Sequence, residues 1–152
     1  MIDKNSVEIL LVEDDEDDAR LIYLALKSRK LLNNLVHLKD GTEAIDFIFA
    51  QGKFSKRQVK DLPKVILLDL DMKGINSKEI LRKLKSDERT SDIPVVILTS
   101  SEEHPDLQAC YEIGISTYIL KPVVFEEFIT AMAGLRCFWF VLHRPMCLKE
   151  QI

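Results

Sequence analysis

Short apolar runs alternate along the chain with segments whose apolar residues recur at helical spacing. Residues 65–69 read VILLD, and an apolar run of this kind is typical of a strand buried on both faces of a parallel sheet. Similar runs predict four more strands, at 7–12, 35–39, 94–99 and 117–120. Amphipathic spacing predicts helices at 17–30, from 42 to the glycine at 52, from 76, at 104–112 and at 124–143.

Local signals mark several of these boundaries. Asn76 and Glu79 have the spacing of a capping box, with the asparagine accepting from the backbone and the glutamate reaching back. Gly114 is expected to end the fourth helix in a left-handed conformation. We interpret residues 53–63 as a solvated loop that carries the basic residues Lys53, Lys56, Arg57 and Lys60.

Five strands separated by helices make a series of βα units. Right-handed crossovers place such helices on both faces of the sheet. The sequence therefore predicts an α/β fold, a doubly wound five-stranded parallel sheet covered by helices on both sides. With 152 residues we expect one domain over 1–152, with its core at about 7–143 and no second domain after it.

The balance of charged residues limits the classes of partner that the chain is expected to bind. Lys and Arg number 21 and Asp and Glu number 25, which gives a net charge of −4 and argues against nucleic acid or an anionic membrane as the main partner. No segment approaches the ~20 consecutive apolar residues that a membrane-spanning helix needs. The first residues have no basic region or long apolar run, so we expect a cytoplasmic protein.

Polar residues gather where the predicted strands end. In a doubly wound sheet the carboxyl ends of all strands face one crevice, where ligands bind. The residues expected there are Glu13, Asp14 and Asp15 after the first strand, Asp69 at the end of the third, Thr99 and Ser100 at the fourth, and Lys121 after the fifth.

Such a set suits phosphoryl chemistry. Close carboxylates repel one another unless a cation lies between them, and Mg²⁺ is a hard cation that prefers oxygen ligands. A carboxylate, Mg²⁺, a lysine and a hydroxyl are the parts needed to bind a phosphoryl group and neutralise its charge. Asp69 is then a nucleophile that accepts phosphate. We attribute Glu16, Asp17 and Asp18 instead to the positive end of the first helix.

At this point the sequence resembles the receiver domains of two-component response regulators, over about residues 8–143. The matching segments are ILLVEDD at 9–15, VILLDLDM at 65–72, PVVILTSS at 94–101 and YILKP at 118–122. The resemblance implies the flavodoxin-like fold of CheY and a phosphorelay function. The loop at 53–63 and the segment LRCFWFVL also resemble small regulators that pair with phytochrome-type histidine kinases.

The resemblance implies a role for each position. Asp69 would be the phosphoacceptor. Asp14 would bind Mg²⁺ directly, Glu13 through a water, and Asp71 through its main-chain carbonyl. The acidic pair could alternatively be Asp14 and Asp15. The remaining implied roles are phosphoryl contacts by Thr99 and Lys121, an aromatic switch at Tyr118 coupled to Thr99, and a cis bond before Pro122.

The loop after Asp69 departs from the family pattern. The family usually has a proline four residues after the phosphoacceptor and a glycine eight residues after it, where this chain has Lys73 and Ser77. Metal coordination by Asp71 is therefore less well supported than coordination by Asp14.

Two alternative functions remain open. A receiver-like module that binds partners without phosphorylation is one. The other is a haloacid dehalogenase-like phosphatase, because Asp69-Leu-Asp71 resembles that family's D-x-D motif. Those enzymes usually continue with Thr or Val and bring their metal-binding acids late in the chain, whereas here Met72 and Lys73 follow and the acidic pair comes first.

The C-terminal segment predicts a homodimer. Residues 137–142, CFWFVL, carry no charge and must present apolar side chains in every direction on a helix. Large apolar surfaces on soluble proteins are usually interfaces, and aromatic residues are favoured anchors there. The expected dimer residues are Phe138, Trp139 and Phe140.

Overall fold

The computed structural model describes residues 9–27, 35–72 and 76–132. Five parallel strands form one sheet in the order β2-β1-β3-β4-β5. The predicted fold class is confirmed, and the strand bounds lie close to the expected ones. The strands are β1 (Ile9–Val12), β2 (Leu35–Leu38), β3 (Val65–Asp69), β4 (Val95–Thr99) and β5 (Thr117–Leu120).

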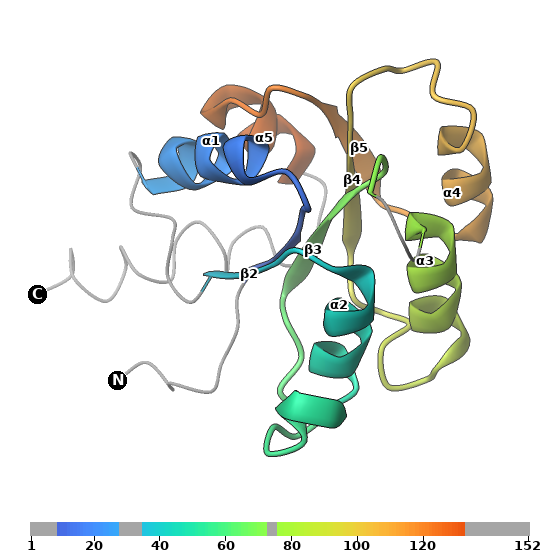
Figure 1. The fold of residues 1–152 in the computed structure, drawn as a ribbon. Helices are drawn as coiled ribbons and strands as arrows, with labels where there is room; N and C mark the ends of the chain where they lie inside the picture. Colours follow the sequence, from blue (N-terminus) through green and yellow to red (C-terminus); the bar gives the residue numbers. More distant parts are fainter. Residues whose placement is uncertain (1–8, 28–34, 73–75, 133–152) are drawn as a thin grey trace, which may run out of the picture.

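Helices cover both faces of this sheet (Figure 1). On one face lie α1 (Glu16–Lys27) and α5 (Phe125–Met132), and on the other lie α2 (Gly41–Ile48), α3 (Ser77–Ser86) and α4 (Leu107–Ile113). A short 3-10 helix, η1 (Gly52–Phe54), follows α2. Among the described residues no helix has both the length and the apolar character needed to cross a membrane.

The central strands supply side chains to two cores. In β1, Leu10 and Val12 pack with α2, α3 and α4, while Ile9 and Leu11 pack with α1 and α5. The same alternation holds in β3 and β4, which explains why these runs are continuously apolar. Phe128 brings α5 onto the second core and is fully buried. Burial of each large side chain contributes roughly 1.5–3 kcal/mol, so the two cores together fix the sheet that presents the site.

Two helix ends differ from the sequence expectation. α2 ends before Gly52, because Ala50 takes the left-handed conformation (φ 54°) immediately after the end residue Phe49. α4 begins at Leu107 rather than His104, since residues 104–106 form a turn in which the Leu107 amide donates to the His104 carbonyl at 3.1 Å. α4 ends as expected at Gly114, whose φ is 133°.

The capping box before α3 has the expected residues in a modified arrangement. Asn76 accepts a hydrogen bond from the Glu79 amide at 2.9 Å. The Glu79 carboxylate meets the Asn76 side-chain amide at 3.4 Å, where a backbone N–H was expected.

The loop at 53–63 is only partly solvated, so our interpretation of it was incomplete. Lys53, Lys56 and Lys60 are exposed. The Arg57 guanidinium, in contrast, lies 3.7 Å from the centre of the Phe47 ring and donates to the Asp61 carbonyl at 2.7 Å. This arginine therefore holds the loop against α2.

Several expectations fall partly or wholly outside the described residues. They are the first residues of the strand at 7–12, the end of the helix at 17–30, the loop position Lys73, the helix beyond residue 132, and the dimer residues Phe138, Trp139 and Phe140.

Candidate functional site

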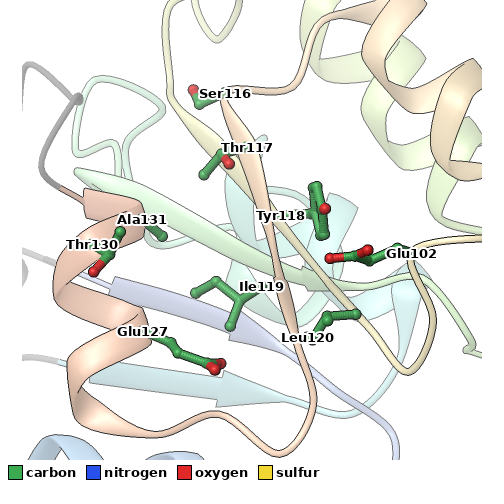
Figure 2. A pocket seen from close by; sticks show the side chains of 9 residues that line it. All are labelled: Glu102, Ser116, Thr117, Tyr118, Ile119, Leu120, Glu127, Thr130 and Ala131. Carbon is green, nitrogen blue, oxygen red and sulfur yellow. The ribbon is translucent and has the colours of Figure 1, made fainter.

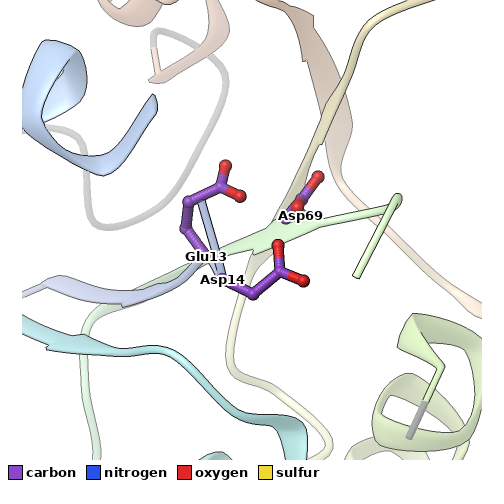
Figure 3. A group of neighbouring side chains, drawn as sticks. All are labelled: Glu13, Asp14 and Asp69. Atoms are coloured by element: carbon purple, nitrogen blue, oxygen red, sulfur yellow. The ribbon is translucent and has the colours of Figure 1, made fainter. Parts of the chain in front are cut away.

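The site lies at the point of the sheet where the order of the strands reverses. β1 is flanked by β2 on one side and β3 on the other, so the crossovers from β1 and β2 leave a crevice at the carboxyl ends of β1 and β3. Glu13 directly follows β1, and Asp69 is the last residue of β3. Together with Asp14, they offer one carboxylate oxygen each within 4.8 Å of one another (Figure 3).

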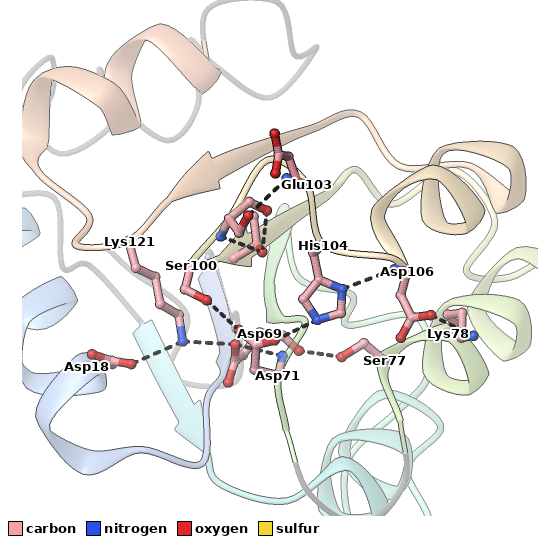
Figure 4. A network of polar contacts seen from close by, with 12 residues as sticks. Asp18, Asp69, Asp71, Ser77, Lys78, Ser100, Glu103, His104, Asp106 and Lys121 are labelled. Atoms are coloured by element: carbon pink, nitrogen blue, oxygen red, sulfur yellow. Dashed lines mark hydrogen bonds and ion pairs between the residues drawn. The ribbon is translucent and has the colours of Figure 1, made fainter.

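Lys121 holds this acidic group together from the end of β5. Its Nζ lies 2.9 Å from Glu13 Oε1 and 2.9 Å from Asp69 Oδ1. It also lies 3.1 Å from Asp18 Oδ2, on α1. Asp18, which we attributed to the helix terminus alone, therefore belongs to the ion-pair network as well (Figure 4). The Lys121–Pro122 peptide bond is cis, as expected.

Burial sets the electrostatics of the group. Glu13 is fully buried and Asp69 is 2% exposed. Burial, followed by the neighbouring Asp69, raises the pKa of Glu13 to about 8 from its ordinary 4.5. Burial alone lowers the pKa of Lys121, but the adjacent carboxylates of Asp69 and Glu13 outweigh it, so that the pKa rises above its ordinary value. The lysine is thus a permanent cation between two crowded carboxylates.

Main-chain contacts fix the position of the two buried carboxylates. Nε2 of His37, on β2, lies 2.8 Å from the Glu13 carbonyl oxygen. The Glu13 amide donates to the Leu38 carbonyl at 3.0 Å. The Asp71 amide donates to Asp69 Oδ1 at 3.1 Å. The buried Ser77 hydroxyl donates to the Asp69 carbonyl. Ser77, noted in the sequence only as a departure, thereby ties α3 to the end of β3.

The carboxylate of Asp71 is oriented by the loop between β4 and α4. Asp71 Oδ1 lies 2.7 Å from His104 Nε2, and Asp71 Oδ2 accepts from the Ser100 hydroxyl at 3.3 Å (Figure 4). The sequence patterns do not identify His104 as a site residue, because a lone histidine in a sequence carries no signal of its partner. The contact depends on a turn that brings residue 104 over the end of β3.

The two expected switch residues make contacts of their own on β4 and β5. Thr99 is buried, and its hydroxyl donates to the Ser101 carbonyl at 3.1 Å, at the start of the β4–α4 loop. Tyr118 lies on β5 with its ring edge-on to Tyr111, 6.3 Å between centroids. Burial and the adjacent Glu102 raise the pKa of Tyr118.

Tyr118 and Glu102 line a surface pocket of about 790 Å³ over β5 and α5 (Figure 2). A second pocket, of about 570 Å³, lies over the acidic group itself. Its lining includes Asp15, which the alternative acidic pair names, as well as Asp69, Asp71 and Lys121.

The donor set fits a hard divalent cation. Within the described part of the chain, Glu13 Oε1 is buried and has no aligned hydrogen-bond donor, although the Lys121 ammonium lies beside it. One ammonium cannot balance these three carboxyl groups once all of them are ionised, and a divalent ion bound by oxygen ligands would neutralise the remaining negative charge. Glu13, Asp14 and Asp69 are therefore suited to hold Mg²⁺ or Mn²⁺.

Comparisons with known proteins agree with this geometry. The family model of the response regulator receiver domain matches residues 9–133. Response regulator Rcp1 of Synechocystis sp. is 34% identical over 131 residues, covering 86% of this chain and 87% of Rcp1. The probable methanogenesis regulatory protein FilR2 of Methanothrix harundinacea is 32% identical over 136 residues, covering 90% and 85%.

Solved structures give the same relationship. The bacteriophytochrome response regulator RtBRR is 42% identical, with a TM-score of 0.80 over 88% of this chain and 80% of that one. The Mn²⁺-bound form of Rcp1 is 34% identical, with a TM-score of 0.70 over 88% and 94%. The family model spans most of this sequence, so the chain belongs to the response regulator receiver domain family of two-component signalling.

Proposed function

We propose that this protein accepts a phosphoryl group on Asp69 from a histidine kinase, with Mg²⁺, and thereby changes its binding to a partner. One observation carries the proposal. Lys121 contacts Asp69 and Glu13 at 2.9 Å each, at the carboxyl end of a doubly wound sheet. A buried carboxylate beside a fixed cation and further acidic ligands is what a phosphoryl acceptor requires.

The transfer step uses the side chains already in place. A carboxylate oxygen of Asp69 attacks the phosphorus of a phosphohistidine, so that a P–O bond forms as the P–N bond breaks. The leaving imidazole keeps the electron pair and takes a proton from solvent. Lys121 then pairs with the phosphoryl oxygens, since its ammonium already lies 2.9 Å from Asp69 Oδ1. When bound, Mg²⁺ supplies charge neutralisation at those oxygens.

Glu13, Asp14 and Asp69 would hold the cation, with the main-chain carbonyl of Asp71 as a further ligand. Glu13 would act through a water bound to the cation. The ion-pair network argues for Glu13 and Asp14 as the acidic pair, because Glu13 contacts Lys121 directly.

The response to phosphorylation would begin at Thr99. A new dianion at Asp69 attracts the Thr99 hydroxyl, which now bonds to Ser101, and the movement leaves space for the Tyr118 ring to turn inward. Such a local charge acting on a two-state element is how phosphorylation switches proteins. The pocket over β5 and α5, which Tyr118 lines, is the surface that would change.

The relatives suggest the class of kinase. Structures described as a bacteriophytochrome response regulator and as a cyanobacterial phytochrome response regulator are among the similar ones. We propose a phytochrome-type histidine kinase as the partner, in the cytoplasm.

We also propose a homodimer through Phe138, Trp139 and Phe140, on the sequence pattern alone. Sedimentation of the wild type against a Phe138→Glu, Phe140→Glu variant tests it, and a wild-type monomer at tens of micromolar would end that proposal.

Intact-mass measurement with acetyl phosphate and Mg²⁺ tests the function. One added phosphoryl group per chain is expected, and none with EDTA or with Asp69→Asn. Equal labelling of the Asn variant would contradict the assignment of Asp69. Sustained release of phosphate with many turnovers per minute would instead favour the phosphatase alternative, and a chain that never labels would favour the phosphorylation-independent module.

A further inference from the structure

His104 and Asp71 form a contact that the transfer step above does not use. His104 Nδ1 lies 3.1 Å from the Asp106 amide, which can only donate, so Nδ1 accepts. The ring proton then resides on Nε2, which points at Asp71 Oδ1 at 2.7 Å. The neutral imidazole thus accepts from the backbone at the beginning of α4 and donates to Asp71, and in this way it links the two segments.

This contact keeps one carboxylate away from the others. Asp71 lines the same pocket as Glu13, Asp14 and Asp69. Yet its oxygens face His104 and Ser100, and the group of carboxylates close enough to share one ion consists, among the described residues, of Glu13, Asp14 and Asp69. The side chain of Asp71 is 36% exposed, so without His104 the contact that the described residues would still offer it at the rim is the longer one to Ser100.

We propose that His104 is a positioning residue for the phosphoacceptor site, which holds the Asp71 carboxylate at the rim and out of the metal-binding group. This inference rests on the proposed function and adds a residue to it. A freed Asp71 carboxylate would offer the cation one more anionic ligand and would repel the incoming phosphodonor dianion. Metal binding would then become tighter while phosphorylation becomes slower, an opposite pair of effects that a general loss of folding does not produce.

Four variants of the full chain test this role. His104→Ala removes the contact, whereas His104→Gln keeps a donor near the position of Nε2. His104→Ala combined with Asp71→Asn removes both the contact and the released charge. Lys78→Ala is the matched control, because it breaks the 3.0 Å ion pair between α3 and Asp106 at the start of α4 without touching Asp71.

Two readouts are measured for each variant: the Kd for Mn²⁺ alone by calorimetry, and the labelling rate with acetyl phosphate and Mg²⁺ by intact mass. We expect His104→Ala to bind Mn²⁺ about tenfold more tightly and to label several-fold more slowly, since one charge moves several ångströms toward the ion. The Gln variant should lie within about twofold of wild type, and the double variant should bind Mn²⁺ less tightly and label faster than His104→Ala, by the same reasoning.

His104→Ala matching wild type in both readouts would overturn the positioning role, and so would a Lys78→Ala variant that reproduces its effects. Failure of the double variant to recover would also overturn it. A wild type that binds Mn²⁺ but never labels would contradict the proposed function instead, while the Mn²⁺ measurements still decide the role of His104.

Discussion

Replacing Glu13 with glutamine should change how the stability of the metal-free protein depends on pH. Glu13 is fully buried beside Asp69, and burial raises its pKa from 4.5 to about 8. Between these values the folded protein holds a proton that the unfolded chain has lost. The free energy of unfolding therefore falls as the pH rises through this interval. Glutamine has the same shape and no charge, so the free energy of unfolding of Glu13→Gln should not fall over this interval.

The size of the effect follows from the width of the interval. Each pH unit is worth about 1.4 kcal/mol, so the loss accumulates to an upper value of about 5 kcal/mol by pH 8. Lys121 does not cancel it, because that lysine is protonated in both states below pH 8 and its raised pKa acts only at higher pH. Glu13→Gln should be close to wild type at pH 5 and more stable by a few kcal/mol at pH 8.5.

Urea unfolding in EDTA at pH 5 to 9, followed by circular dichroism, measures the difference. Glu88→Gln, which neutralises an exposed carboxylate after α3, is the control and should follow the wild type at every pH. Added Mg²⁺ should flatten the wild-type curve, since a bound cation favours the charged form of Glu13. Parallel curves for wild type and Glu13→Gln in EDTA would refute the reasoning.

Three further variants test the packing around the site. Phe128→Ala removes a fully buried ring that brings α5 onto the sheet, and should lower the free energy of unfolding by about 3–5 kcal/mol, against a small change for the exposed Val124→Ala. Ser77→Ala leaves the buried Asp69 carbonyl without its donor and should cost about 1–3 kcal/mol, while the exposed Ser86→Ala should cost little. Lys121→Met leaves two buried carboxylates without their shared cation; we expect a loss of about 3–5 kcal/mol in EDTA that Mg²⁺ partly restores. Urea unfolding checks all three, and wild-type stability in any of them would contradict the corresponding contact.

Much of the fold follows from local patterns in the sequence. The central strands could be predicted because β1, β3 and β4 are buried on both faces. Burial on both faces requires a continuous apolar run, whereas a helix that packs on one face of the sheet needs apolar residues on one side only. The end of α2 could not, because Ala50 carries no signal for its positive φ, whereas Gly52 does. The Arg57 stacking on Phe47 was missed for a related reason, since a basic loop residue is exposed in most proteins.

The contacts in the site also divide into those that the sequence predicts and those that it does not. Glu13, Asp69 and Lys121 could be brought together from sequence because each lies at the end of a strand or directly after one, and parallel strands align their carboxyl ends. His104, Ser77 and Asp18 lie in a turn or at helix beginnings, where the direction of a side chain depends on tertiary packing. Their contacts with Asp71, Asp69 and Lys121 became visible only in three dimensions.

The central claim is that residue 69 carries the phosphoryl group, and borohydride trapping tests it most directly. Reduction of an aspartyl phosphate breaks the bond between the carboxyl carbon and the phosphate oxygen, releases phosphate and leaves homoserine. After treatment with acetyl phosphate and Mg²⁺, then borohydride, peptide mass spectrometry should find homoserine at position 69 and at no other aspartate. Homoserine at position 14 or 71 with an unchanged Asp69 would contradict the account.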